Sequence, residues 1–261
     1  MDDYILNIKT VQSGAFRILI EALKEILTDG NLIFDETGMK LMAMDSTHTI
    51  LIHMKLEACN FEFFHCPGKT VTGVNMLNLF KLIKTMTNSE TLTLFIEKNN
   101  ENSLGIRINN TEKNSQTTYK LNLLDIPEDN IVIPPAEFET ELSYPSSDFQ
   151  KIIRDMVNIG ENIEIKSIGP QLILNCTGDF ASQETILGET NNGLKFNQTT
   201  SEDKPVQGMY SLKYLMLFTK CTNLCNQIQL YIKNDYPLII QYTIASLGMI
   251  KLCLAPKTDN S

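Results

Sequence analysis

Basic residues recur in pairs along four segments of this sequence whose apolar spacing is typical of amphipathic helices. The pairs are Arg17 and Lys24, Lys81 and Lys84, Lys151 and Arg154, and Lys213 and Lys220. Each pair lies roughly 110° to 180° around the helix from the apolar stripe of its segment, so the cations are expected to point away from the core. A solvated helix face would explain any single pair. Four equivalent pairs in a chain of net charge -9 instead predict one shared electropositive surface that follows a phosphate backbone.

No motif for reading bases accompanies these cations, so binding is expected to be independent of nucleic-acid sequence. Catalytic signatures are equally absent. The stretch from Pro67 to Thr70 resembles the end of a phosphate-binding loop, but that loop requires glycine where this chain has Phe63. His48, His53 and His65 lack the spacing of known metal motifs. We therefore expect no catalytic residue, no metal site and no cofactor.

The elements that carry the basic pairs belong to an internal repeat, which occurs twice in the chain. Residues 74–96 align without a gap on residues 210–232 at an offset of 136, which places Lys84 on Lys220. Residues 16–26 align on residues 149–159 at an offset of 133. A duplicated helix-and-sheet unit favours a symmetric scaffold over an enzyme with one asymmetric pocket.

Alternating or apolar runs predict the strands of the first half, and helical periodicity predicts its two helices. The expected strands are residues 4–8, 31–35, 39–44, 50–56, 61–64, 91–97, 103–108 and 117–123, and the expected helices are residues 16–27 and 75–86. Each half is therefore expected to follow the order β-α-β-β-β-α-β-β-β. The sequence predicts an α+β fold of two similar domains.

A proline-rich acidic stretch separates the two halves. It contains Pro127, Pro134 and Pro135, which oppose a central strand, so we expect an extended surface connector. The predicted organisation is a domain of residues 1–120, a connector of residues 121–137 and a domain of residues 138–261. Residues 131–133 are apolar, and they either pack on the sheets or form one edge of a binding groove.

Composition places the chain among ordinary globular proteins. The 43% hydrophobic content contains no run near the roughly 20 apolar residues that span a bilayer. The acidic start lacks the features of a secretory signal, which predicts an intracellular protein. The six cysteines form neither a disulfide framework nor a paired metal motif, so reduced thiols are expected.

Several motifs in this order resemble the eukaryotic sliding clamp family, proliferating cell nuclear antigen. They are residues 44–48 (MDSTH), 149–155 (FQKIIRD), 159–161 (IGE), 214–220 (YLMLFTK), 235–238 (DYPL) and 254–257 (LAPK). The resemblance runs nearly end to end and implies a clamp-type fold, in which three subunits form a ring with helices lining the hole and sheets outside. Three chains would carry 3 × (-9) = -27, so the basic helices would make the hole the one favourable place for duplex DNA.

The resemblance also implies three sets of site residues. The channel set is Arg17, Lys24, Lys81, Lys84, Lys113, Lys151, Arg154 and Lys220, to which helical periodicity alone adds Lys213. The partner-peptide groove comprises Met44, His48, Leu51, Ile131, Ile133, Pro134, Tyr236, Pro237, Ala255 and Pro256. The subunit contact pairs an edge with Lys113, Thr117, Tyr119 and Leu121 against an edge with Ala181, Gln183, Thr185 and Leu187.

The expected function is that of a non-enzymatic, homotrimeric processivity factor that encircles duplex DNA. Its expected partners are DNA polymerase, an ATP-driven clamp loader, nuclease and ligase. We expect no association with a membrane. Its expected location is the nucleus, or a viral replication compartment if a virus encodes it. Two rivals are a subunit of a heterotrimeric checkpoint clamp and a monomeric viral-type processivity factor. An α+β enzyme of unknown chemistry is the remote alternative.

Overall fold

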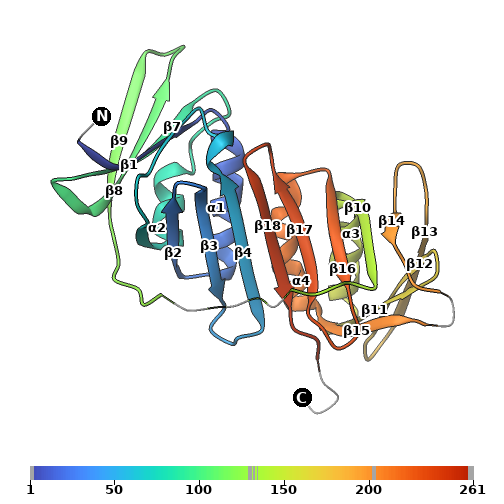
Figure 1. The fold of residues 1–261 in the computed structure, drawn as a ribbon. Helices are drawn as coiled ribbons and strands as arrows, with labels where there is room; N and C mark the ends of the chain where they lie inside the picture. Colours follow the sequence, from blue (N-terminus) through green and yellow to red (C-terminus); the bar gives the residue numbers. More distant parts are fainter. Residues whose placement is uncertain (1–2, 129–130, 132, 134, 202–203, 258–261) are drawn as a thin grey trace. The chain divides into compact units, whose positions relative to one another are not determined.

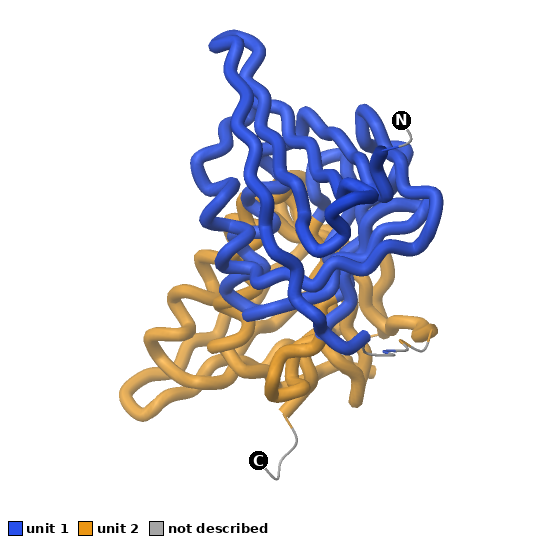
Figure 2. The backbone as a smooth tube through the Cα atoms, turned by 90° about the vertical axis from the view of Figure 1, so that its left-hand side faces the viewer, with its two compact units in different colours: residues 1–43, 53–131, 243–250 blue, residues 44–52, 132–242, 251–261 orange. Residues whose placement is uncertain are grey.

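The computed structural model describes residues 3–128, 131, 133, 135–201 and 204–257. Figure 1 follows the chain from its first strand to its last. The chain divides into two compact units (Figure 2). Unit 1 comprises residues 1–43, 53–131 and 243–250, and unit 2 comprises residues 44–52, 132–242 and 251–261. Each unit therefore includes a short segment from the opposite half of the sequence.

The first half contains two α-helices with five strands between them. Its elements are β1 (Tyr4–Thr10), α1 (Ser13–Ile26), β2 (Asp29–Asp35), β3 (Gly38–Met44), β4 (Ile50–Glu57), the 3₁₀ turn η1 (Ala58–Asn60), β5 (Phe63–His65), β6 (Thr70–Asn75), α2 (Met76–Ile83), β7 (Thr91–Glu97), β8 (Asn100–Asn110) and β9 (Ser115–Asn122). One antiparallel sheet has the order β5-β1-β7-β8-β9, and β2 pairs with both β3 and β6.

The second half repeats this order with two α-helices and five intervening strands. Its elements are β10 (Thr140–Pro145), α3 (Ser146–Val157), β11 (Asn162–Ile168), β12 (Gln171–Thr177), β13 (Ser182–Gly188), β14 (Lys195–Gln198), β15 (Val206–Ser211), α4 (Leu212–Phe218), the 3₁₀ segment η2 (Thr219–Leu224), β16 (Gln227–Ile232), β17 (Leu238–Ile244) and β18 (Gly248–Leu254). One sheet has the order β13-β12-β11-β15. A second set of neighbouring paired strands has the order β14-β10-β16-β17.

The α+β class is confirmed. Among the described residues five strands lie between the two helices of each half, where the expected order has three and the expected ranges of the first half have four. The additional strands are short or polar. β6 follows the turn around Gly68 and runs directly into α2, and β14 is a four-residue strand, KFNQ. The polar β14 leaves little alternation in the sequence, whereas β6, TVTGVN, contains β-branched residues that favour a strand and was not identified.

The duplication is visible in the matching starts of the helices. Ser13 begins α1 and Ser146 begins α3, 133 positions later, while Met76 and Leu212 begin α2 and α4 at an offset of 136. Both serines are buried and bond to the segment after the second helix of their half. Ser13 Oγ donates to the Thr87 carbonyl at 2.8 Å, and Ser146 Oγ donates to the Cys225 carbonyl at 2.5 Å. The two copies therefore share this serine hydrogen bond as well as a sequence pattern.

Each half packs its two helices together over an apolar core (Figure 1). The large buried apolar residues of the helices are Phe16, Leu19, Ile20 and Leu23 on α1, Met76, Leu79 and Ile83 on α2, Phe149, Ile153 and Met156 on α3, and Leu212, Leu215 and Phe218 on α4. The helix α4 ends after seven residues, where Thr219 Oγ1 donates to the Met216 carbonyl at 2.8 Å and the chain tightens into η2.

All six cysteines are free of disulfides in the structure. Burial raises the pKa of the Cys221 thiol to about 12 and that of Cys253 to about 11, so both thiols are protonated at neutral pH. Among the described residues, no helix has the length and apolar content needed to cross a membrane.

Candidate nucleic-acid and partner interfaces

The cations predicted for the helices divide into an exposed set and a half-buried pair. Lys81, Lys84, Lys151, Arg154, Lys213 and Lys220 are exposed, and each lies within or directly after α2, α3 or α4. Lys113 is exposed as well, but it lies in the turn between β8 and β9, where its backbone N–H donates to Asn110 Oδ1 at 2.9 Å. The helix set can therefore offer ammonium and guanidinium groups to an anion in solvent.

On α1 the two cations are already paired. Arg17 contacts Glu21 across 3.5 Å, Lys24 pairs with Glu25, and the Lys24 ammonium lies 4.9 Å from the centre of the Phe80 ring. By contrast, the stretches from Met76 to Lys84 and from Leu212 to Lys220 contain two basic residues each and no acidic residue. The segments of the duplicated helices α2 and α4 thus carry more uncompensated positive charge than α1 or α3.

A tight loop after β3 is organised by the Asp45 carboxylate. Its oxygens accept the backbone N–H groups of Thr47 at 3.2 Å, Thr49 at 2.8 Å and Ile50 at 2.6 Å, and the Thr47 hydroxyl bonds to it as well. Burial opposes ionisation of this group, but these hydrogen bonds outweigh it and hold the pKa of Asp45 below its usual value. The loop fixes His48 at a positive φ of 55°.

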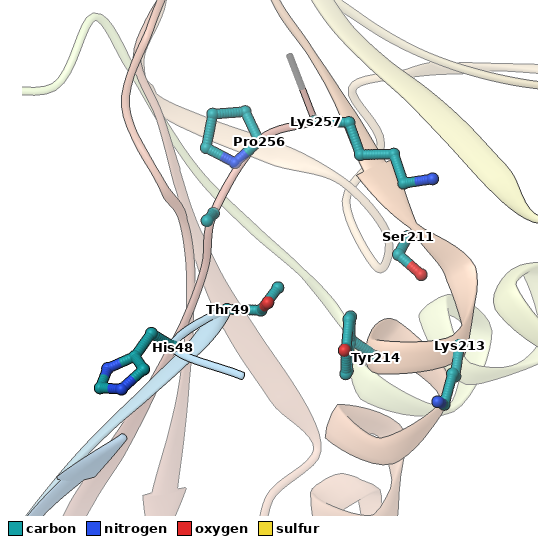
Figure 3. Close-up of a pocket in the computed structure, with 8 residues that line it drawn as sticks. His48, Thr49, Ser211, Lys213, Tyr214, Pro256 and Lys257 are labelled. Carbon is teal, nitrogen blue, oxygen red and sulfur yellow. The ribbon is translucent and has the colours of Figure 1, made fainter. Parts of the chain in front are cut away.

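An open pocket of about 430 Å³ lies beside this loop in unit 2, and we call it the loop pocket. Its lining residues are His48, Thr49, Ser211, Lys213, Tyr214, Ala255, Pro256 and Lys257. The C-terminal segment is attached to the loop, because the Ala255 N–H donates to the Thr49 carbonyl at 3.0 Å. In Figure 3 the Thr49 side chain points toward Tyr214, and Pro256 and Ser211 lie on opposite sides of the opening. Hydroxyl and ammonium groups make this pocket more polar than the groove that the sequence predicted.

The structure brings three predicted groove residues, His48, Ala255 and Pro256, into the loop pocket. Met44 lies just outside, with its sulfur 3.4 Å from His48 Nδ1, and it is exposed. The remaining described groove residues are half-buried and do not line this pocket: Leu51, Ile131, Ile133, Tyr236 and Pro237. Pro134 lies outside the described residues.

Tyr236 belongs to an aromatic cluster with Phe138 and Tyr231. The Phe138 ring lies 5.3 Å from Tyr231 and meets Tyr236 edge-on at 5.7 Å. The Lys233 ammonium donates to the Glu137 carbonyl at 3.1 Å, so this cluster holds the end of the predicted connector. Residues of the connector and of the loop before β17 therefore meet within unit 2.

The start of the connector is attached to unit 1 by backbone contacts. The Leu124 N–H donates to the Gly73 carbonyl at 2.8 Å, and Asn31 Nδ2 donates to the Ile126 carbonyl at 3.1 Å. Gly73 is required here, because a Cβ atom at this position would lie 2.2 Å from the Leu124 carbonyl oxygen. The predicted connector is thus anchored on unit 1 as far as Glu128, which pairs with Lys69 at 2.5 Å.

The two predicted subunit edges are open edges of sheets. β9 ends the five-stranded sheet, and β13 ends the four-stranded sheet. Opposite residues of antiparallel strands share a face, so Thr117, Tyr119 and Leu121 continue the face of the buried Ile108, Ile106 and Leu104. In the same way, Gln183, Thr185 and Leu187 continue the face of Cys176, Leu174 and Leu172. Each edge therefore leaves core-facing side chains only partly covered.

Phe180 is a residue that the sequence did not single out. It lies beside Ala181, just before β13, and 77% of its surface is exposed. A large exposed aromatic residue next to an open strand indicates a contact surface. Exposure of one phenylalanine has no periodic signal, so only the fold identifies it. The loop-pocket residues Ser211, Tyr214 and Lys257 were also missed as groove residues, because neither periodicity nor the resemblance assigned them to the groove.

The loop around Asp45 gives a stability prediction. Asp45→Asn keeps the shape of the side chain but removes its charge, so we expect the free energy of unfolding at pH 7 to fall by about 2 kcal/mol. A lowered carboxyl pKa stabilises the fold above the unfolded pKa of about 4, and this stabilisation is lost as pH falls through the folded value. Urea unfolding at several pH values should therefore show the two proteins converging in acid. A constant difference down to low pH would contradict the role of the Asp45 charge.

Two duplicated helix-and-sheet halves, outward basic helices and open sheet edges define the class of sliding clamps. The family model for the C-terminal domain of proliferating cell nuclear antigen matches residues 132–257, and that for the N-terminal domain matches residues 5–130. The chain therefore belongs to the proliferating cell nuclear antigen family.

Two relatives extend over almost the whole chain. A protein of Paramecium bursaria Chlorella virus 1, described as a probable DNA polymerase sliding clamp 1, is 35% identical over 98% of this chain and 98% of its own length. The proliferating cell nuclear antigen of Chaetomium thermophilum is 28% identical over 97% of this chain and 98% of its own length. The fold and both comparisons assign the chain to the sliding clamps.

Proposed function

We propose that three copies of this chain close into a ring around duplex DNA and hold a DNA polymerase on its template. The observation that carries this proposal is the recurrence of exposed cations on duplicated helices, in a chain whose net charge is -9. A single convex patch on such a protein would bind DNA weakly, because the average surface repels it. Lining a closed hole with the basic helices gives the phosphates one favourable place.

Sequence-independent sliding follows from this arrangement. Phosphate contacts repeat along the duplex and carry no base information, so a ring exchanges equivalent contacts as it moves. Topology would then keep the clamp on DNA without a tight complex. Catalysis is not needed for this role, and an ATP-driven loader would supply the energy for opening the ring.

The subunit contact would join β9 of one chain to β13 of the next. Such pairing would satisfy the free backbone groups of both edges and cover Tyr119 and Leu187. Charge favours the match as well. Residues 178–189 contain Asp179, Glu184 and Glu189 and no basic residue, while Lys113 lies beside β9.

The loop pocket, together with the other residues of the predicted groove, would receive short peptides from polymerase, loader, nuclease and ligase. A compact peptide turn with aromatic and aliphatic anchors would cover Ile131 and Pro256, and the hydroxyls of the loop pocket would bind its polar groups. We propose the nucleus as the location, or a viral replication compartment if a virus encodes the chain.

Light scattering on the purified chain tests the ring. We expect a particle of 3 × 29.5 = 88.5 kDa at micromolar concentration. A particle of 29.5 kDa would contradict the homotrimer. A trimer obtained only after mixing with other purified clamp subunits would favour the heterotrimeric alternative.

Peptide capture gives a separate prediction. Replacing Ile131 or Pro256 with aspartate should weaken binding of a clamp-binding peptide at least tenfold, because a buried charge replaces an apolar contact of about 2 kcal/mol. Calorimetry measures this loss, and light scattering of the same samples should still give the trimer. Unchanged affinity in both variants would show that the peptide binds elsewhere.

A further inference from the structure

A second pocket adjoins the loop pocket and has no role in the function proposed above. This helix pocket has a volume of about 330 Å³ and lies between the end of α3 and the start of α4, both in unit 2. Val157, Gly160, Glu161, Asn162 and Leu212 line this pocket alone. Ser211, Lys213 and Lys257 line both pockets. The two pockets are therefore neighbouring compartments of one trough.

The shared wall carries two cations. Figure 3 shows the Lys257 side chain extending past Ser211, with Lys213 on the helix below it. Among the described residues, neither lysine takes part in an ion pair, although Lys213 lies 5.6 Å from the Tyr214 ring centre. An occupant that crosses this wall would gain most by placing a carboxylate there.

The helix pocket itself offers apolar surface to an occupant. Val157 is 37% exposed at the end of α3, and the buried Leu212 lies behind it. A peptide supplies both complementary groups, namely an apolar side chain for this surface and a carboxylate for the two lysines of the shared wall.

We propose that the helix pocket binds the continuation of the partner peptide whose anchor occupies the loop pocket, through an apolar residue next to an aspartate or glutamate. This inference rests on the proposed peptide-binding function. Continuity of the two pockets across Ser211 favours a single extended occupant. Duplex DNA fits this compartment less well, because the apolar Val157 side chain has no donor or positive charge for a phosphate and the Glu161 carboxylate repels phosphate.

The test uses calorimetry with synthetic peptides and the full-length chain. One peptide carries only the aromatic and aliphatic anchors, and two others add a short extension containing leucine and aspartate at one end or the other. We expect one of the two extensions to tighten binding about tenfold, as burial of one aliphatic side chain allows. Val157→Asp should remove this gain and leave the affinity for the anchor-only peptide unchanged.

Two further variants separate the possible outcomes. Val11→Asp is the matched control, because Val11 is 51% exposed in unit 1, and it should change neither affinity. Glu161→Lys retains the apolar floor, and it should tighten only the extended peptide. Failure of the anchor-only peptide to bind the unmodified chain would overturn the proposed groove and this inference together.

Three results would overturn the inference alone. The anchor-only peptide could bind while neither extension tightens the complex. The extended peptide could retain its advantage on Val157→Asp. Finally, Val157→Asp could impair DNA loading without affecting either peptide, which would place DNA at this pocket.

Discussion

Replacing Lys84 and Lys220 with glutamate should reduce loading on duplex DNA at least tenfold at moderate salt, while the trimer remains folded. These two lysines occupy the same position in the two copies and are both exposed. They follow helices that contain no acidic residue, so each reversal changes an uncompensated positive site. In a trimer the change reaches 3 × 2 = 6 positions around the hole.

Stability should be preserved because neither lysine forms an ion pair within the described residues. The matched control reverses Lys9 and Lys195, which are exposed on strands and carry the same total charge change. Loading on nicked circular DNA would be measured across a salt series. Equal loss in the control would indicate a general effect of net charge, and the assignment of Lys84 and Lys220 to the channel would then be wrong.

The same loading assay can rank the helices by their contribution to DNA binding. Reversing Lys81 with Lys84, or Lys151 with Arg154, should also weaken loading without unfolding the chain. On α3, Asp148 and Asp155 already offset the two cations, so we expect the smaller loss there. A larger loss from α3 than from α2 would show that position around the hole outweighs local net charge.

Tyr119→Asp or Leu187→Asp should convert the trimer into monomers. In the proposed ring each subunit contact would use one β9 edge and one β13 edge, so either change would alter every contact. Each side chain continues a buried sheet face, and pairing would enclose it. Burying an unpaired carboxylate costs several kcal/mol, which exceeds the value of one edge contact. Light scattering should give 29.5 kDa for both variants.

Phe180→Ser should weaken the trimer less, since it removes apolar contact without adding a buried charge. Val11→Asp is again the control, as its exposed side chain lies outside both edges. Circular dichroism would verify that the monomeric variants remain folded. Folded Tyr119→Asp and Leu187→Asp proteins that still form trimers would contradict the pairing of β9 with β13.

The sequence predicts the fold class and the helices well because these depend on strong periodic signals. Lys84 directly follows α2, and its repeat partner Lys220 lies in η2, two residues after the end of α4. The strand β14 was missed because it is short and polar, while β6 was missed although its sequence, TVTGVN, contains β-branched residues that favour strands. Only the fold places Thr49 beside Ser211 and Tyr214, because the loop pocket joins three distant segments.

The edge strands illustrate what the resemblance adds to periodicity. Residues 182–188 and 115–122 are polar enough to resemble surface loops, yet they form β13 and β9 at sheet edges. Alternation predicted a strand at residues 117–123, whereas only the resemblance pointed to residues 182–188. Neither periodicity nor the resemblance identified Phe180, because it belongs to no periodic run and to none of the clamp-like motifs.

The central claim is that this chain encloses DNA topologically. Loading the clamp on nicked circular DNA with an ATP-driven loader, and then cutting that DNA once, tests this claim most directly. We predict that gel filtration at high salt finds the clamp with the circular DNA and finds it released from the linear DNA. Equal retention on both forms would mean that affinity holds the protein, and it would contradict a sliding ring.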